Sequence, residues 1–194
     1  MSEPLPIPTL RGEQVTLRRH TAADAPAVYE RAVDPVARQY TTVPVEYTPQ
    51  MAMEFVTGFT APSADQVSWA IEVDCAYAGT IDLRVLDRSA GAGSLGFATH
   101  QEFRGRGVMS DAVRVVVGHA FDDLGWSALR WEAHAGNWGS AKVVWRCGFP
   151  APTFVPDLLV ERGRLLDGWI STLHADQPRE PVAPWDEVVA ALSR

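Results

Sequence analysis

The sequence predicts an α+β fold built on a mixed, mostly antiparallel twisted sheet with one parallel strand-helix-strand crossover. Two observations lead to this prediction. In the first half of the chain, short segments that alternate apolar and polar residues, as strands do, follow one another across short connections and form hairpins. In the second half, an amphipathic helix separates two strands, and a crossover of this kind makes its strands parallel.

The composition is that of one globular domain. The chain has 194 residues, 46% of them hydrophobic, and seven tryptophans, which is enough for one sizeable core. It contains neither an apolar run of about 18 residues nor the basic and apolar regions of a secretory signal. We therefore expect a cytoplasmic protein that does not enter a membrane.

Charge and cysteine content argue against a general nucleic-acid-binding protein and against a protein held together by disulfides or a metal. The net charge of −7 disfavours general nucleic-acid binding, because affinity for phosphate backbones comes from clustered Lys and Arg. Cys75 and Cys147 lie far apart and have no partner at metal-ligand spacing, so neither a disulfide framework nor a metal site is predicted. Both are expected to be small core residues.

The first half of the chain is predicted to hold four strands and two helices. Thr21 and Asp24 are spaced as a capping box and begin a helix that ends at Asp34-Pro35. After a loop over residues 39–47, Thr48-Pro49 begins the second helix. Its apolar stripe consists of Met51, Phe55, Val56 and Phe59. The strands are expected over residues 15–19, 67–73, 80–85 and 94–99.

The second half begins with the longest predicted helix. Its apolar residues recur at helical spacing from Met109 to Leu124, and Gly125 ends it. Further elements are expected over residues 128–134 (strand), 140–147 (helix), from Phe149 onward (strand) and 165–173 (strand). After a Pro-containing linker, the last helix should dock one apolar face on the domain or on a second copy in a homodimer. That face consists of Trp185, Val188, Val189 and Leu192.

One loop carries the clearest functional signal. Arg104-Gly105-Arg106-Gly107-Val108-Met109 lies between a strand and the long helix, where free N–H groups and the positive helix end form an anion site. An ordinary turn is the alternative. A P-loop is disfavoured because Gly-Lys-Ser/Thr is absent, and a dinucleotide fingerprint is disfavoured because residues 99–103 separate the loop from its strand.

The loop resembles the Arg/Gln-x-x-Gly-x-Gly/Ala acetyl-CoA pyrophosphate loop of the GNAT superfamily of N-acetyltransferases. Arg104 and Gly107 match this pattern, while Met109 replaces the small residue that is usual at the last position. A second family signature is an Asn before a short helix that ends in Gly-Phe. Asn137 and Gly148-Phe149 stand at the matching spacing.

The whole pattern over residues 15–173 resembles the branch that includes the ribosomal-protein alanine and serine N-acetyltransferases. The resemblance implies a GNAT-like acetyltransferase domain over residues 1–174. Residues 175–194 would then form the linker and a short C-terminal helix outside it.

The resemblance also implies where acetyl-CoA binds. Backbone N–H groups of Gly96, Phe97 and Ala98 are expected to polarise the acetyl carbonyl. The residues expected to bind the coenzyme are Phe97, Ala98, Thr99, Arg104, Gly105, Arg106, Gly107, Val108, Met109, Asn137 and Ser140. The aromatic residues that either wall the acceptor slot or belong to the core are Tyr40, Tyr47, Trp69, Trp138 and Trp169.

The candidate acid for the leaving thiolate is a serine. Many family members carry a tyrosine seven positions after the Asn, and here that position is Val144. The resemblance points to Ser140 as the substitute, since a thiolate is a moderate leaving group that one hydroxyl donor can assist. Capping of the short helix is the alternative role for Ser140.

The candidate base for the attacking amine is Glu132, whose position before the Asn resembles that of the base in some ribosomal-protein acetyltransferases. A carboxylate of raised pKa can accept the proton of the amine directly or through water. A salt bridge with Arg130 or Arg146 is the alternative role for Glu132. His134 and Asp82 are reserve candidates for the base.

The predicted reaction is direct acetyl transfer from acetyl-CoA to a primary amine, without a covalent enzyme intermediate or a metal. A protein N-terminus, a polyamine-like metabolite and an aminoglycoside-like antibiotic all remain open as acceptors. A non-catalytic module that senses acyl-CoA is the second hypothesis, favoured by the missing tyrosine. A nicotinamide-binding enzyme is the third.

Overall fold

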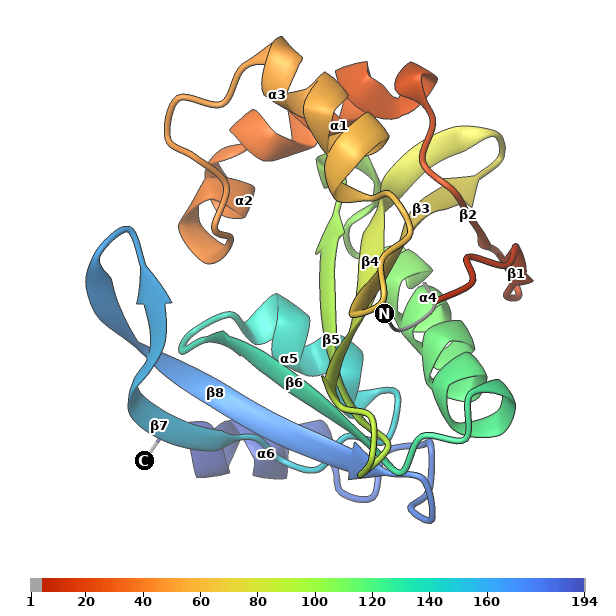
Figure 1. Ribbon diagram of the computed structural model, residues 1–194. Coiled ribbons are helices and arrows are strands. Elements are labelled where there is room, and N and C mark those ends of the chain that lie inside the picture. The colour runs from red at the N-terminus through yellow and green to blue at the C-terminus, as the bar shows by residue number, and fades with distance from the viewer. Residues whose placement is uncertain (1–4, 194) are drawn as a thin grey trace.

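The computed structural model describes residues 5–193 and consists of one eight-stranded sheet with helices on both faces (Figure 1). The strand order is β1-β2-β3-β4-β5-β6-β8-β7. Neighbouring strands are antiparallel except β5 and β6, which α4 connects in parallel. The predicted α+β architecture with one parallel crossover is therefore confirmed.

The elements follow the predicted order. The strands are β1 (Leu10–Arg11), β2 (Thr16–Arg18), β3 (Gln66–Val73), β4 (Ala76–Asp87), β5 (Ala92–Thr99), β6 (Ala128–His134), β7 (Thr153–Glu161) and β8 (Arg164–His174). The helices are α1 (Ala25–Val33), α2 (Pro35–Tyr40), α3 (Pro49–Glu54), α4 (Val108–Gly118), α5 (Trp138–Trp145) and α6 (Trp185–Leu192). None of the helices within residues 5–193 has the length and apolar character needed to cross a membrane.

The larger part of the core lies between the sheet and α4. Val113 and Val116 of α4 are fully buried against sheet residues such as Leu95, Leu129 and Trp131. The helix continues through one π-helical turn and ends at a glycine of positive φ, as its apolar spacing predicted. This packing fixes the beginning of α4 against the middle of the sheet.

The opposite face of the sheet carries a smaller core under α1 and α3. Val28 and Val56 pack there against Ala70 and Tyr77 of the sheet. The predicted capping box at the start of this region is present, with Thr21 and Asp24 bonded to each other's backbone. The two cores hold helices on opposite sides of the same strands.

A helix that sequence analysis missed follows α1 directly. Asp34-Pro35 ends α1, as predicted, but it also begins α2, with the Asp34 carboxylate accepting the Ala37 N–H (2.9 Å). Pro35 occupies the first helical position, where its missing N–H costs nothing. The segment expected to be a loop over residues 39–47 therefore begins only at Thr41.

Three further local predictions were wrong. Met51 and Phe59 of the expected apolar stripe are exposed, and the helix continues beyond α3 as a π-helical turn over Phe55–Phe59. Cys75 lies exposed at the tip of the β3–β4 hairpin with φ 65°, whereas Cys147 is buried as predicted, and burial raises the pKa of its thiol to about 12. The strand expected from Phe149 begins only at Thr153.

The N-terminal hairpin is tied to α4 by one buried carboxylate. Asp111 accepts the backbone N–H groups of Glu13 (3.2 Å), Gln14 (2.8 Å) and Val15 (3.2 Å). A β-carbon at Gly12 would lie 2.6 Å from this carboxylate, so only glycine fits there. The hairpin thus holds the first turn of α4 in place.

The C-terminal helix α6 docks on its own domain rather than projecting from it. Val188 is 2% exposed, and the Trp185 ring lies 5.3 Å from that of Trp145. Trp145 donates its indole N–H to the Ala183 carbonyl (2.9 Å), and Arg179 forms a two-bond ion pair with Asp122. Apolar and polar contacts together attach the tail to α5 and to the π-helical turn that follows α4.

Val188→Ala should lower the free energy of unfolding by about 2 kcal/mol, because buried methyl groups are lost and a cavity remains. Val182→Ala, in the same tail but at a 65% exposed position, should change it by less than about 0.5 kcal/mol. Chemical denaturation measures both values. Equally small changes in the two variants would show that α6 does not stabilise the domain.

The stability of the protein should also depend on Asp82, a buried carboxyl of β4. Burial raises the pKa of Asp82 from 3.8 to about 6, despite the opposing effect of Arg84. The native state therefore binds this proton more tightly than the unfolded state. The stabilisation that comes from this tighter proton binding at Asp82 is complete below about pH 4 and is lost as the pH rises through about 6.

Asp82→Asn removes this titration, so the stability of the variant relative to wild type should rise by up to about 3 kcal/mol between pH 4 and pH 7. Urea unfolding at both pH values measures the difference. Asp87→Asn, on the same strand, should show the opposite trend, because hydrogen bonds from Ser89 and Ala90 lower the pKa of Asp87. A pH-independent difference for Asp82→Asn would contradict the raised pKa.

Candidate active site

The site begins where two paired strands part. β5 and β6 pair in parallel only from Ala92/Ala128 to Leu95/Trp131, although β5 continues to Thr99 and β6 to His134. Beyond that point β5 still pairs with β4, and β6 with β8. The facing edges of residues 96–99 and 132–134 thus keep backbone groups that another molecule can bind.

The first turn of α4 opens at this gap without a side-chain cap. Its N-cap is Gly107, with φ 82°, and no side chain accepts from the first N–H groups of the helix. In contrast, α2, α3 and α5 are capped by Asp34, Thr48 and Asn137. Uncapped N–H groups at the positive end of a helix are suited to bind an anion.

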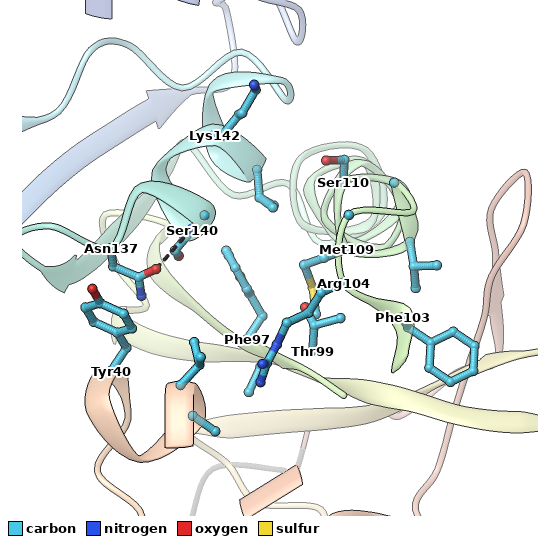
Figure 2. Close-up of a pocket in the computed structure, with 18 of the residues that line it drawn as sticks. Tyr40, Phe97, Thr99, Phe103, Arg104, Met109, Ser110, Asn137, Ser140 and Lys142 are labelled. Atoms are coloured by element: carbon cyan, nitrogen blue, oxygen red, sulfur yellow. Dashed lines mark hydrogen bonds between the residues drawn. The ribbon is translucent and has the colours of Figure 1, made fainter. Parts of the chain in front are cut away.

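A cavity of about 470 Å³ joins the gap to this helix end. Every residue predicted to bind the coenzyme lines it except Arg106, whose guanidinium lies over the ring of Phe103 at 5.0 Å. Figure 2 shows Asn137 and Ser140 on one side of the cavity, and Thr99, Arg104 and Met109 on the other. Segments that are distant in the sequence are brought together here.

The structure adds lining residues that sequence analysis did not find. One group comes from α2 and the residue after it, and includes Val36, Ala37 and Thr41. The other comes from α5 and its C-cap, and includes Lys142 and Arg146. The first group was missed because sequence analysis did not predict α2. The four-residue spacing of Lys142 and Arg146 places both on one helix face, and this was the available signal for the second.

Arg104 is held by an ion pair with the cap of α2. Its Nη2 lies 2.6 Å from Asp34 Oδ1. Burial raises the pKa of Asp34, but the hydrogen bonds from Arg104 and the Ala37 N–H outweigh burial and hold this pKa below its usual 3.8. A charged Asp34 thus links the loop before α4 to the helix that forms the other wall of the cavity.

Ser140 is not the cap of α5. Asn137 Oδ1 accepts the Ser140 N–H (3.2 Å), so Asn137 is the cap and Ser140 lies within the first turn. Ser140 Oγ accepts the indole N–H of Trp131 (3.1 Å). The alternative interpretation of Ser140 as a helix cap is therefore wrong, and Ser140 is one of the residues that line the cavity.

Glu132 lies on the face of the sheet opposite α4, because Leu129 and Trp131 alternate with it and are buried under α4 and α5. Its Oε1 lies 3.2 Å from Arg130 Nε, which is the predicted salt bridge with Arg130. Glu132 does not line the cavity around Ser140. It borders the gap from the strand edge of β6.

The two reserve candidates also lie near the gap. Asp82 pairs across β4 and β5 with Gly96, and a β-carbon at Gly96 would stand 2.9 Å from Asp82 Oδ2. His134 Nε2 lies 2.9 Å from the buried Glu161 carboxylate. The His134 ring also contacts Tyr40 edge-on, which connects it to the cavity.

Among the aromatic residues considered for the acceptor slot, only Tyr40 lines the cavity. Its hydroxyl donates to the Gly136 carbonyl (3.3 Å). Trp69 and Trp169 are buried in the core, and Trp169 packs edge-to-face against Trp138, which is 37% exposed. The interpretation as core residues therefore fits Trp69 and Trp169.

Comparison with known proteins identifies the family. The model of the acetyltransferase (GNAT) domain matches residues 14–150. The uncharacterized N-acetyltransferase p20 of Bacillus licheniformis is 22% identical over 169 residues, which cover 85% of this chain and 95% of that protein. The region matched by the family model contains both the loop over residues 104–109 and the loop that contains Asn137.

Solved structures share the fold. A GNAT-family acetyltransferase from Bacillus anthracis superposes with a TM-score of 0.78 at 14% identity, covering 88% of this chain and all of the other. RimL, a ribosomal L7/L12 alpha-N-protein acetyltransferase in complex with coenzyme A, gives 0.72 at 16% identity and covers 89% and 98% of the two chains. The microcin C7 self-immunity acetyltransferase MccE, in complex with acetyl-CoA and AMP, gives 0.73 at 15% identity and 84% and 93% coverage.

The family model covers well over half of the chain. The protein therefore belongs to the GNAT family of acetyltransferases, enzymes that use acetyl-CoA.

Proposed function

We propose that this protein transfers the acetyl group of acetyl-CoA directly to the primary amine of a peptide or protein N-terminus, within one ternary complex. The observation that carries the proposal is the uncapped start of α4, which opens into the gap between β5 and β6 beside Arg104. A long ligand with an anionic group and a backbone-like arm fits both features. Acetyl-CoA has both and also supplies an activated acetyl thioester.

The loop before α4 binds the pyrophosphate in this proposal. Gly105 and Gly107 have φ values of 74° and 82°, so the backbone adopts a conformation that few other residues tolerate. Arg104 adds a positive charge beside it. Lys142 of α5 and Arg146, the C-cap of that helix, line the same cavity and supply further charge for the anionic end of the coenzyme.

The carbonyl and the amine meet at the edge of β5. Those backbone N–H groups of Gly96, Phe97 and Ala98 that face the gap, and not β4, polarise the acetyl carbonyl, which needs fixed donors as negative charge develops. Glu132, across the gap, accepts the proton of the attacking amine directly or through water. Ser140 donates its hydroxyl hydrogen bond to the sulfur as the carbon–sulfur bond breaks.

The charges of the acceptor side favour a peptide terminus over a polycation. Each carboxylate named on this side already has a basic partner: Asp82 pairs with Arg84, Glu132 with Arg130, and Glu161 with His134 and Arg162. A polyamine or aminoglycoside gains most from uncompensated negative charge. RimL, a ribosomal L7/L12 alpha-N-protein acetyltransferase with the same fold, agrees with this choice.

Acetyl-CoA should raise the melting temperature, whereas S-acetylpantetheine, which lacks the pyrophosphate, should not, because only the former reaches the loop and stabilises the native state. Gly107→Glu should abolish the shift by placing bulk and negative charge at the phosphate. Gly125→Glu makes the same substitution at a glycine of φ 66° with open space around it and should keep the shift. Equal shifts by both compounds in the wild type would contradict the loop assignment.

Glu132→Gln should lower kcat by about 10²-fold to 10⁴-fold while leaving acetyl-CoA affinity unchanged. Glutamine has nearly the size of glutamate but cannot accept the proton of the amine. Raising the pH should restore part of the rate, because more of the amine is then neutral. Steady-state kinetics against pH measure both effects.

The control for this variant is Glu72→Gln, which breaks another strand ion pair, with Arg18, and should not change kcat. Asp82→Asn and His134→Gln test the reserve candidates in the same assay. Near-normal turnover of Glu132→Gln at neutral pH would assign Glu132 to its salt bridge and the base to Asp82, His134 or water.

One observation favours a second candidate, a module that binds acyl-CoA without catalysis. Val144 stands where many family members carry the acidic tyrosine, and its side chain is fully buried. Release of free thiol from acetyl-CoA over a panel of amines and N-terminal peptides separates the two functions. Binding without thiol release for any acceptor would favour the sensing module.

A further inference from the structure

A buried tryptophan holds the hydroxyl of Ser140. Trp131 of β6 is 2% exposed and donates its indole N–H to Ser140 Oγ (3.1 Å). The backbone N–H of Ser140 is bound by Asn137 Oδ1 (3.2 Å). Two independent hydrogen bonds therefore fix Ser140 at its main chain and at its side chain, while the residue still lines the cavity.

The bond from Trp131 also decides where the Ser140 hydrogen points. An indole N–H only donates, so Ser140 Oγ accepts this bond and its own hydrogen remains to be placed. Helical hydroxyls commonly donate to the carbonyl four residues earlier, as Thr41, Thr57 and Thr60 do here with distances of 2.6, 2.7 and 3.0 Å.

Ser140 differs from these threonines. The carbonyl four residues before it, that of Gly136, already accepts the Trp138 N–H (2.9 Å) and the Tyr40 hydroxyl (3.3 Å). Throughout residues 5–193, Ser140 Oγ donates to no protein acceptor. Its hydrogen is therefore available to a group within the cavity.

We propose that Trp131 is a positioning residue for the reaction: it holds Ser140 Oγ as an acceptor, so that the hydroxyl hydrogen points at the departing sulfur. The inference rests on the proposed role of Ser140. An N–H bond to the oxygen also polarises the hydroxyl and makes it a stronger donor.

The step needs no additional reactant. As the amine nitrogen bonds to the acetyl carbon, the carbon–sulfur bond breaks and its electron pair stays on sulfur. Ser140 stabilises this thiolate by a hydrogen bond and keeps its own proton, because an alcohol is a weaker acid than a thiol. The thiolate takes its proton from water, and the proton of the amine leaves through the base.

Trp131→Phe keeps an aromatic ring in the core and removes only the N–H donor. We expect kcat to fall by about threefold to tenfold, the usual effect of losing one hydrogen bond, with the KM for acetyl-CoA unchanged. Trp145→Phe removes a similar indole bond, to the Ala183 carbonyl (2.9 Å), and should leave kcat unchanged.

A double-mutant cycle separates positioning from mere packing. Ser140→Ala should lower kcat more than Trp131→Phe, and adding Trp131→Phe to it should cost no further turnover, since no hydroxyl is left to orient. If the fold-decreases in kcat of the two single variants multiply in the double variant, the proposal is overturned. A fall in kcat of equal size in Trp145→Phe would overturn it as well.

One measurement does not depend on the folding of the Trp131 variant. In the indole region of a ¹⁵N-correlated spectrum, Ser140→Ala should shift one tryptophan N–H resonance, that of Trp131, by removing its acceptor. An unchanged spectrum would overturn the proposal. Wild-type protein that binds acetyl-CoA but acetylates no amine would instead refute the proposed function. An active wild type in which the effects of Ser140→Ala and Trp131→Phe on kcat are independent would refute only the role of Trp131.

Discussion

The parting of β5 from β6 is the constraint on which the rest of the site depends. A sheet gains stability from continuous pairing, yet here the parallel ladder stops at Leu95 and Trp131. The two side chains are buried and fill the point where the strands separate, so the gap ends in packed core. Beyond it the facing strand edges keep free backbone groups, a costly arrangement that the coenzyme arm alongside β5 would satisfy in the function that we propose.

Several polar contacts keep the surroundings of the gap in one geometry. Asp111 ties the N-terminal hairpin to the first turn of α4. Asp34 caps α2 and also holds Arg104, so both walls of the cavity meet at one carboxylate. Among the helices around the cavity, only α4 begins without a side-chain cap. Its first N–H groups are therefore free to bind an anion.

Trp131 connects the packing of the domain with its chemistry. Its ring belongs to the main core, and its N–H reaches Ser140 on α5. Because a close-packed core holds side chains in defined positions, a hydroxyl anchored to it is held more firmly than one on a surface loop. In the mechanism that we propose, the same arrangement lets a serine take the place of the longer tyrosine that many family members carry.

The sequence by itself determined the hairpins, the crossover helix and the two loops that precede α4 and α5, because these depend on local spacing, on glycines of positive φ and on capping residues. Tertiary structure decided what local signals left open: that Asp34-Pro35 begins a helix, that Asn137 and not Ser140 caps α5, and that Glu132 pairs with Arg130. The physical reason is that hydrogen-bond and ion-pair partners compete. The winning partner depends on which atoms distant segments bring within reach, and only the packed chain sets those distances.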